Sequence, residues 1–200
     1  MSVSNSVKKQ ILRKEKGRPF TGREFLKLGS RKAVDCALAR LIADNTITRV
    51  SQGIYMRPKS TQFVKVVAPD VYEVVKAVAA RTGETIGMAG AEAVQRLKLS
   101  TQVPIQAMFY TTGSTRELTI NNQRVKLRHV ADRKLALAGK PAGMVLSALW
   151  YLGEEAVNNE VLNTVTQQMP PSVLAEVESS NIPAWMTNAI HNYRSVVQST

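Results

Sequence analysis

The chain has 200 residues, of which 44% are hydrophobic and 21% charged, a composition typical of one large or two small globular domains. Its net charge of +12 is unusual and unevenly distributed. Fourteen basic and four acidic residues give residues 1–60 a net charge of +10, and twelve basic and six acidic residues give residues 61–140 a net charge of +6. Residues 141–200, with one basic and five acidic side chains, carry −4. This asymmetry indicates a polyanionic partner for the basic part of the protein.

Composition also bears on the compartment. The single cysteine, Cys36, excludes an internal disulfide framework and fits a reducing environment. No apolar run approaches the ~20 residues of a membrane span, and the N-terminus lacks the apolar core of a signal peptide. We therefore expect a cytoplasmic protein that has no membrane partner.

Two helices are expected at the start of the chain. The first has apolar residues at helical spacing and ends before Gly17. Thr21 and Glu24 have the spacing of a capping box, in which each residue satisfies a backbone N–H at a helix start. A second helix is therefore expected to begin near Thr21 and to end at a tight turn formed by Gly29 and Ser30.

A third helix is expected from Ser30, a good N-cap, to Asn45, which tolerates the left-handed conformation common after a helix end. Two β-prone runs follow, at residues 47–50 and 54–57, and the turn between them contains Gly53. Helix, turn, helix and ribbon in this order are typical of a winged helix-turn-helix domain, which we place at residues 1–60.

The polar face of the third helix favours DNA as its ligand. Cations near its N-terminus can contact guanine edges or phosphates, and small residues let the helix enter a major groove about 12 Å wide. Solvated cations on a small helical domain are the alternative, and the succession of two helices and a ribbon favours DNA. The polar face consists of Arg31, Lys32, Asp35, Cys36, Ala39, Arg40 and Ala43. The candidate DNA-binding residues are Arg31, Lys32, Asp35 and Arg40 on this helix and Arg49, Gln52 and Arg57 on the ribbon.

The remainder, residues 61–200, is expected to form a mixed α/β domain, so the predicted fold class is α+β. Its part 61–140 is basic, and its part 141–200 is helical and acidic. Asp70 and Gly83 are expected to cap the two ends of a helix in the basic part. Another helix is expected from about residue 89 to 97, and the short run Gly87-Met88-Ala89-Gly90 before it is interpreted as a backbone turn.

Three strands are expected in the basic part, over residues 106–111, 117–120 and 123–129. In the third strand, Val125 and Leu127 alternate with a row of cations formed by Arg124, Lys126 and Arg128. This row is either a solvated sheet surface or a secondary nucleic-acid contact. For RNA, the strands offer only Phe109 and Tyr110 as stacking platforms, and adjacent residues of a strand lie on opposite faces.

The acidic part is predicted to consist of helices interrupted at Gly153, at Pro170-Pro171 and at Pro183. In the last helix four residues recur at helical spacing and are expected to face the core: Trp185, Ala189, Tyr193 and Val196.

No catalytic residue, metal site or cofactor is expected. His129 and His191 have no cysteine or carboxylate at ligand spacing, and one cysteine does not make a zinc signature. Neither of the common glycine-rich phosphate-binding motifs occurs. Gly113-Ser114 is similar to the Gly-Ser that opens nucleotidyltransferase sites, but Asp132 is the only Asp in the β-rich stretch, and two-metal phosphoryl transfer needs closely placed carboxylates. We therefore do not expect an enzyme.

The polar-faced helix (SRKAVDCALARL, residues 30–41) and the ribbon (ITRVSQGIY, residues 47–55) resemble the AbiEi-type antitoxins of bacterial abortive-infection (type IV) toxin–antitoxin modules. The segment LSTQVP at residues 99–104, followed by the strand pair, is also similar to this family. The resemblance is good over residues 1–60, looser to about residue 150, and does not extend over the last fifty residues.

The resemblance implies an N-terminal winged domain that binds inverted repeats in its own promoter and represses transcription. It also implies a C-terminal domain that neutralises a cognate toxin, typically a nucleotidyltransferase encoded next door. By position, Arg31, Lys32 and Arg40 correspond to the recognition helix, and Arg49 and Gln52 to the wing. Whether copies act as a homodimer or as independent monomers stays open, as does direct contact with the toxin.

The expected function is thus a sequence-specific DNA-binding repressor that is the antitoxin of such a module. Two alternatives belong to other classes. One is an RNA-binding protein that uses the basic strand face, and the other is an interaction adaptor whose acidic C-terminal helices dock a basic partner.

Overall fold

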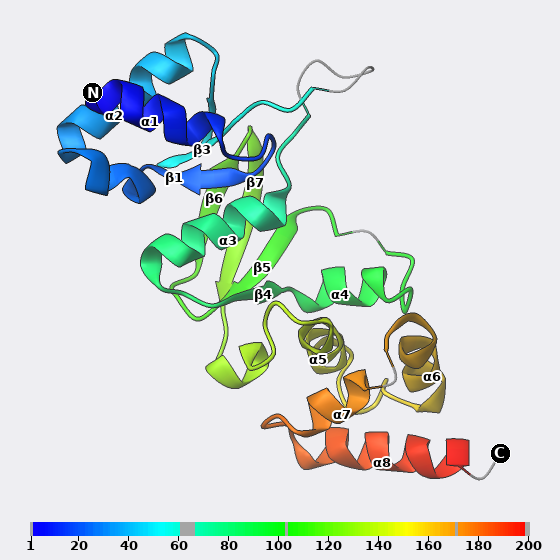
Figure 1. Cartoon of the computed structure of the whole chain (residues 1–200). Coiled ribbons are helices and arrows are strands. Elements are labelled where there is room, and N and C mark those ends of the chain that lie inside the picture. The colour runs from blue at the N-terminus through cyan, green and yellow to red at the C-terminus, as the bar shows by residue number, and fades with distance from the viewer. Residues whose placement is uncertain (1, 61–66, 103, 171, 199–200) are drawn as a thin grey trace. The chain divides into compact units, whose positions relative to one another are not determined.

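The computed structural model describes residues 2–60, 67–102, 104–170 and 172–198 (Figure 1). It has a mixed α+β fold, in agreement with the expected class. The chain divides into two compact units, the first made of residues 1–83 with 118–123 and the second of residues 84–117 with 124–200. Within the described ranges, no helix is long and apolar enough to cross a membrane.

The first unit begins with three helical segments: α1 (Val3–Leu12), the 3₁₀ helix η1 (Gly22–Leu28) and α2 (Arg31–Ala43). Ser30 caps α2 as expected, since its Oγ accepts a hydrogen bond from the Ala33 N–H. Asn45 ends it with a φ of +55°, which confirms the expected stop. The second expected helix is η1, whose seven residues form a 3₁₀ helix.

The capping box at the start of η1 is present. Glu24 Oε1 accepts a hydrogen bond from the Thr21 N–H at 2.7 Å, and Glu24 Oε2 pairs with Lys14 Nζ at 2.6 Å. Partial burial opposes ionisation of Glu24, but the hydrogen bonds from Lys14 and Thr21 outweigh it and hold the pKa of this carboxyl below its usual value.

The first unit also contains a small antiparallel sheet with the strand order β1-β3-β2. Its strands are β1 (Pro19–Thr21), β3 (Ile54–Met56) and β2 (Thr48–Ser51). The two strands expected as a ribbon are β2 and β3, although each is shorter than predicted. Strand β1 was not expected; it pairs with β3, with Phe20 opposite Tyr55. The helices and this sheet enclose a core in which Ile11, Phe25 and Leu38 are at most 1% exposed.

Helix α3 (Val71–Thr82) also belongs to the first unit, although it lies beyond the expected domain boundary at residue 60. Both of its expected caps are confirmed: Asp70 accepts hydrogen bonds from two backbone N–H groups of the first turn, and Gly83 follows with a φ of +75°. Helix α3 packs against β1 and β3.

A four-stranded sheet has the order β4-β5-β7-β6, with β4 and β5 antiparallel and β5 and β7 parallel. Its strands are β4 (Ile86–Met88), β5 (Ala107–Thr111), β6 (Arg116–Ile120) and β7 (Gln123–His129). The last three confirm the expected strands. Strand β4 corrects the interpretation of Gly87-Met88 as part of a turn, because these residues pair with Tyr110 and Phe109.

The helices of the second unit share one core. They are α4 (Gly90–Arg96), α5 (Pro141–Leu152), α6 (Asn159–Gln168), α7 (Val173–Glu178) and α8 (Ala184–Gln198), and a short 3₁₀ helix, η2 (Asp132–Leu135), precedes α5. Helix α5 is buried along most of its length and packs against α4 and α7. At Gly90 the two helices approach closely, since a Cβ there would meet the side chain of Tyr151 and lie 2.8 Å from the carbonyl oxygen of Ser147.

The inward face of α8 is offset from the expected one. Met186, Ile190 and Tyr193 are buried, whereas Val196 is 52% exposed and Trp185 only half-buried. Trp185 and Ala189 of the predicted stripe are partly buried and pack against the core, and Tyr193 lies in it, so three of the four expected residues do contact the core. The fully buried stripe is centred on Met186 and Ile190 because α8 packs against α6 and α7.

Candidate functional site

Helix α2 presents a continuous exposed face. Its other side is buried through Val34, Ala37, Leu38 and Leu41. The exposed face consists of the residues expected there: Arg31, Lys32, Asp35, Cys36, Ala39, Arg40 and Ala43. The Arg31 side chain is 72% exposed, so no other part of the described chain covers the N-terminal end of this face.

The residues of this face are ordered around the helix axis. At about 100° per residue, Lys32, Cys36, Ala39 and Ala43 lie along the middle of the face, opposite the buried side. Arg31 and Arg40 are nine positions apart, which places them about 180° apart around the axis and on opposite flanks. The exposed face therefore has a central strip, and the side chains of this strip are short except for that of Lys32. The strip lies between two arginines.

The β2–β3 hairpin is held at its turn and along β2. Gly53 has a φ of +72°, which the turn requires and which glycine adopts without strain. The carbonyl oxygen of Val50 accepts a hydrogen bond from the Asn121 N–H at 3.1 Å, and Ser51 Oγ donates to the carbonyl oxygen of Thr119 at 3.1 Å. Residues 118–123 of the first unit thus support the edge strand of the hairpin, while Arg49 and Gln52 stay exposed.

Arg57 has a different environment from the other candidates. Its Nη1 donates hydrogen bonds to the carbonyl oxygens of Leu12 and Lys14, at 2.8 and 2.6 Å. Leu12 is the last residue of α1, so its carbonyl has no partner within the helix, and Lys14 follows two residues later. The structure therefore gives Arg57 a role in closing α1, and its side chain is only partly exposed.

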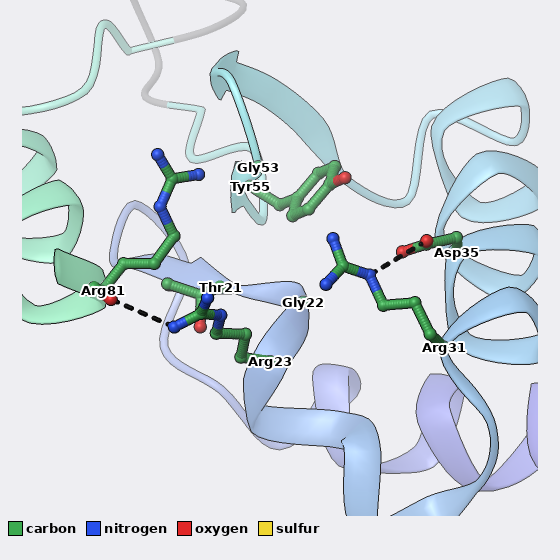
Figure 2. A pocket seen from close by; sticks show the side chains of 8 residues that line it. All are labelled: Thr21, Gly22, Arg23, Arg31, Asp35, Gly53, Tyr55 and Arg81. Carbon is green, nitrogen blue, oxygen red and sulfur yellow. Dashed lines mark hydrogen bonds and ion pairs between the residues drawn. The ribbon is translucent and has the colours of Figure 1, made fainter.

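A pocket of about 150 Å³ lies beside the N-terminal end of α2 (Figure 2). Three arginines line it from three elements: Arg23 from η1, Arg31 from α2 and Arg81 from α3. The other lining residues are Thr21, Gly22, Asp35, Gly53 and Tyr55. Arg23 and Arg81 were not among the candidates from the sequence, since no local pattern links residues 58 positions apart.

The contacts of the three arginines differ. Arg31 Nε lies 3.2 Å from Asp35 Oδ2, an exposed pair one helical turn apart. Arg23 Nη1 donates to the carbonyl oxygen of Arg81 at 3.0 Å. Arg81 Nη1 donates to the carbonyl oxygen of Gln52 at 2.9 Å. Neither Arg23 nor Arg81 forms an ion pair within the described ranges, so their positive charge is held in place by neutral acceptors.

The cations of β7 belong to the second unit and take no part in this pocket. Val125 and Leu127 are fully buried, which confirms the expected alternation. On the opposite face, Arg124 and Arg128 are exposed and Lys126 is half-buried.

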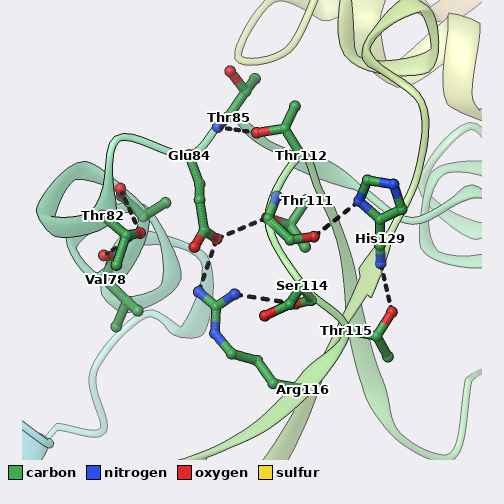
Figure 3. Close-up of polar contacts among 12 residues, drawn as sticks. Val78, Thr82, Glu84, Thr85, Thr111, Thr112, Ser114, Thr115, Arg116 and His129 are labelled. Atoms are coloured by element: carbon green, nitrogen blue, oxygen red, sulfur yellow. Dashed lines mark hydrogen bonds and ion pairs between the residues drawn. The ribbon is translucent and has the colours of Figure 1, made fainter.

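A polar cluster in the second unit was not expected from the sequence (Figure 3). Glu84 Oε2 accepts a hydrogen bond from Thr111 Oγ1 at 2.9 Å and pairs with Arg116 Nη2 at 2.8 Å. His129 Nδ1, at the end of β7, lies 2.9 Å from the carbonyl oxygen of Gly113, which is in the turn between β5 and β6. These contacts fasten the turn between β5 and β6, so we assign the cluster a structural role. Among the described residues, no group of three or more His, Cys, Asp or Glu side chains is placed to hold a metal ion.

The chain belongs to DUF6088, a family of unknown function, whose model matches residues 6–173. The match runs from α1 to the first residue of α7 and therefore includes the α2 face, the hairpin and all three arginines of the pocket. No curated protein matches the sequence.

Proposed function

We propose that this member of the DUF6088 family binds double-stranded DNA, with α2 as the recognition helix and the β2–β3 hairpin as the wing of a winged helix-turn-helix domain. The observation that carries the proposal is the layout of the exposed face of α2. Lys32 and three short side chains form its middle, and Arg31 and Arg40 lie on its flanks.

This layout suits a helix lying in a major groove. Short side chains at Cys36, Ala39 and Ala43 let the helix backbone approach base edges, which are reached through a groove about 12 Å wide. The flanking arginines then face the two phosphate backbones that border the groove, and phosphate contacts position a protein on DNA. Lys32, near the N-terminal end, is the cation of the middle strip and hence the candidate for reading a base.

The hairpin suits the part of a wing. Arg49 is exposed on β2, and the turn that follows is tied to α3 by the bond from Arg81 to Gln52. A hairpin that is already held in position loses little conformational entropy when it contacts DNA. Arg49 and Gln52 are therefore the proposed wing contacts, and Arg57, engaged with α1, is not among them.

The biological role we propose is that of an antitoxin that represses its own operon through promoter inverted repeats. This part rests on the resemblance of residues 30–41 and 47–55 to AbiEi-type antitoxins. Protein bound over a promoter excludes polymerase, and an inverted repeat is read by two copies of one chain. The proposed partner is a nucleotidyltransferase-type toxin encoded next to this gene.

The DNA proposal is tested by introducing bulk into the groove-facing strip. Duplexes are first selected from a random library on the full-length protein, and their affinities are measured by fluorescence anisotropy. Ala39→Trp is expected to weaken binding at least tenfold, because the indole holds the helix away from the base edges. Ala80→Trp is the matched control, since Ala80 is an exposed alanine within α3 of the same unit.

Three results contradict the DNA proposal. The selection enriches no duplex, Ala39→Trp binds as tightly as Ala80→Trp, or structured RNA binds more tightly than any selected duplex. The antitoxin role has a separate test, which is growth rescue on co-expression with a neighbouring nucleotidyltransferase. Failure of rescue removes that role and leaves DNA binding in place.

A further inference from the structure

We propose that the pocket between η1, α2, α3 and the hairpin turn binds a phosphate group, and that Arg23, Arg31 and Arg81 are its ligands. When DNA is bound, the group is a backbone phosphate beside the N-terminal end of α2. That assignment of the phosphate to DNA rests on the proposed function, whereas the chemistry of the pocket does not.

The charge of the pocket selects an anion. Three guanidinium groups line it, and Asp35 is the single carboxylate among the lining residues. Asp35 pairs with Arg31 only through Nε, and both side chains are more than half exposed, so water screens the pair. Arg23 and Arg81 are hydrogen-bonded to carbonyl oxygens, which fix a guanidinium without neutralising it.

The geometry favours phosphate over a monovalent point anion. A guanidinium is a planar fork of N–H donors that matches the oxygens of a phosphate or carboxylate. Within the described chain, the hydrogen bonds of Arg23 and Arg81 use only Nη1, so other donors of each fork are left for a ligand. Figure 2 shows Arg31 entering from α2 and Arg81 from α3, on opposite sides of the pocket. The volume of about 150 Å³ is many times that needed for one water molecule.

The pocket also lies where a bound duplex would run. Arg31 is one of the two flanking arginines of α2, and Gly53 belongs to the turn of the hairpin proposed as the wing. A phosphate held here would contact both Arg31 of the proposed recognition helix and Arg81, which supports the hairpin turn. Arg81 is a residue of α3, so a helix that follows the residues of the predicted winged domain also contributes to the site.

The first arm of the test uses inorganic phosphate as the probe. Arginine side-chain Nε–Hε signals of the full-length protein are followed by NMR while phosphate replaces chloride at constant ionic strength. Saturable shifts are expected for Arg23, Arg31 and Arg81, and none for Arg96. Arg96 is the matched control because its Nε also pairs with a carboxylate four residues away on the same helix, at 3.1 Å from Glu92.

The second arm uses a duplex from the library selection and compares Arg23→Gln and Arg81→Gln with Arg96→Gln. Each of the first two variants is expected to weaken binding and to reduce the slope of log K against log salt by about 1, which is the loss of one phosphate contact. Arg96→Gln is expected to change neither. Arg81→Gln also removes the hydrogen bond that supports the hairpin turn, so weaker binding by this variant has two explanations. Arg23→Gln leaves that bond in place and therefore tests the phosphate contact by itself.

The outcomes separate the two proposals. No saturable shift at Arg23 and Arg81, or an equal shift at Arg96, overturns the phosphate pocket, while the Ala39→Trp result still decides DNA binding. If saturable shifts occur but Arg23→Gln leaves the salt dependence of duplex binding unchanged, the phosphate pocket is supported. Its ligand is then a free phosphorylated molecule rather than a DNA backbone phosphate. Saturable shifts in a protein that selects no duplex support the pocket and contradict the proposed function.

Discussion

Arg81 Nη1 donates a hydrogen bond to the carbonyl oxygen of Gln52, 2.9 Å away, so a residue of α3 holds the turn of the β2–β3 hairpin. The same nitrogen occupies the space beside the next residue, because a Cβ built on Gly53 would lie 2.8 Å from it. Gly53 also has a φ of +72°, which side chains of L-residues rarely adopt. The hairpin turn therefore depends on a contact between segments 29 positions apart.

Gly53→Ala tests this contact. The left-handed conformation alone is expected to lower the free energy of unfolding by about 1–2 kcal/mol. Gly83→Ala is the control, because Gly83 has a φ of +75° in the same unit and no atom within 4 Å of a built Cβ. Amide hydrogen exchange of the first unit measures the loss of stability in each of the two variants. We expect Gly53→Ala also to weaken duplex binding and Gly83→Ala not to, and equal binding by the two variants would contradict the role of the turn.

The layout of α2 predicts different consequences for its middle and its flank. Lys32→Ala is expected to lose about 10- to 100-fold on a selected duplex and little on a scrambled one, since a base contact contributes about 1–3 kcal/mol of discrimination. Arg40→Ala is expected to lose equally on both duplexes, since phosphates carry no sequence. Titrations of the two duplexes at one salt concentration measure this, and the reverse pattern would exchange the two assignments.

The single cysteine provides a footprint of the proposed interface. Cys36 is exposed in the middle strip of α2, so a bound duplex should protect it from alkylation by a maleimide. Conversely, attachment of a bulky maleimide to Cys36 should abolish duplex binding. The rates are followed by mass spectrometry, and Cys36→Ala, treated in the same way, should bind DNA before and after the reagent. Undiminished alkylation at saturating duplex would place the DNA on another surface.

Glu24 predicts how stability depends on pH. In the folded protein, partial burial raises the pKa of Glu24, but hydrogen bonds from Lys14 and Thr21 outweigh burial and hold the pKa below the usual value of 4.5. A lowered folded-state pKa means that the contribution is fully present above pH 4.5 and is lost as the pH falls through the lower value. The stability difference between the parent protein and Glu24→Gln should therefore shrink in acid.

The magnitude of this difference is limited to about 1 kcal/mol, because both charged side chains are partly exposed and water screens them. Thermal unfolding of the parent and of Glu24→Gln at pH 7 and at pH 3 measures it. Glu15→Gln removes a neighbouring exposed carboxylate and controls for net charge. A difference that is the same at both pH values would show that the capping contact does not depend on ionisation.

Local rules predicted much of the first unit. Ser30, Asn45 and Gly83 end or begin helices where expected, because capping depends on a residue and its immediate neighbours. The three-residue strands β1 and β4 were missed, whereas the equally short β3 was expected because a turn containing Gly53 joins it to β2. Strands β1 and β4 form because β3 and β5 offer hydrogen-bonding partners that lie far away in the sequence.

The sequence by itself determined the concentration of positive charge in residues 1–140 and the slim polar face of α2, because charge is a sum over residues and a helical face follows from a period of 3.6. Only the tertiary structure decided that Arg57 closes α1, and that Arg23 and Arg81 join Arg31 around one pocket. A guanidinium on a long flexible chain can reach many partners. Which one it meets depends on how distant segments pack, and no local spacing encodes that.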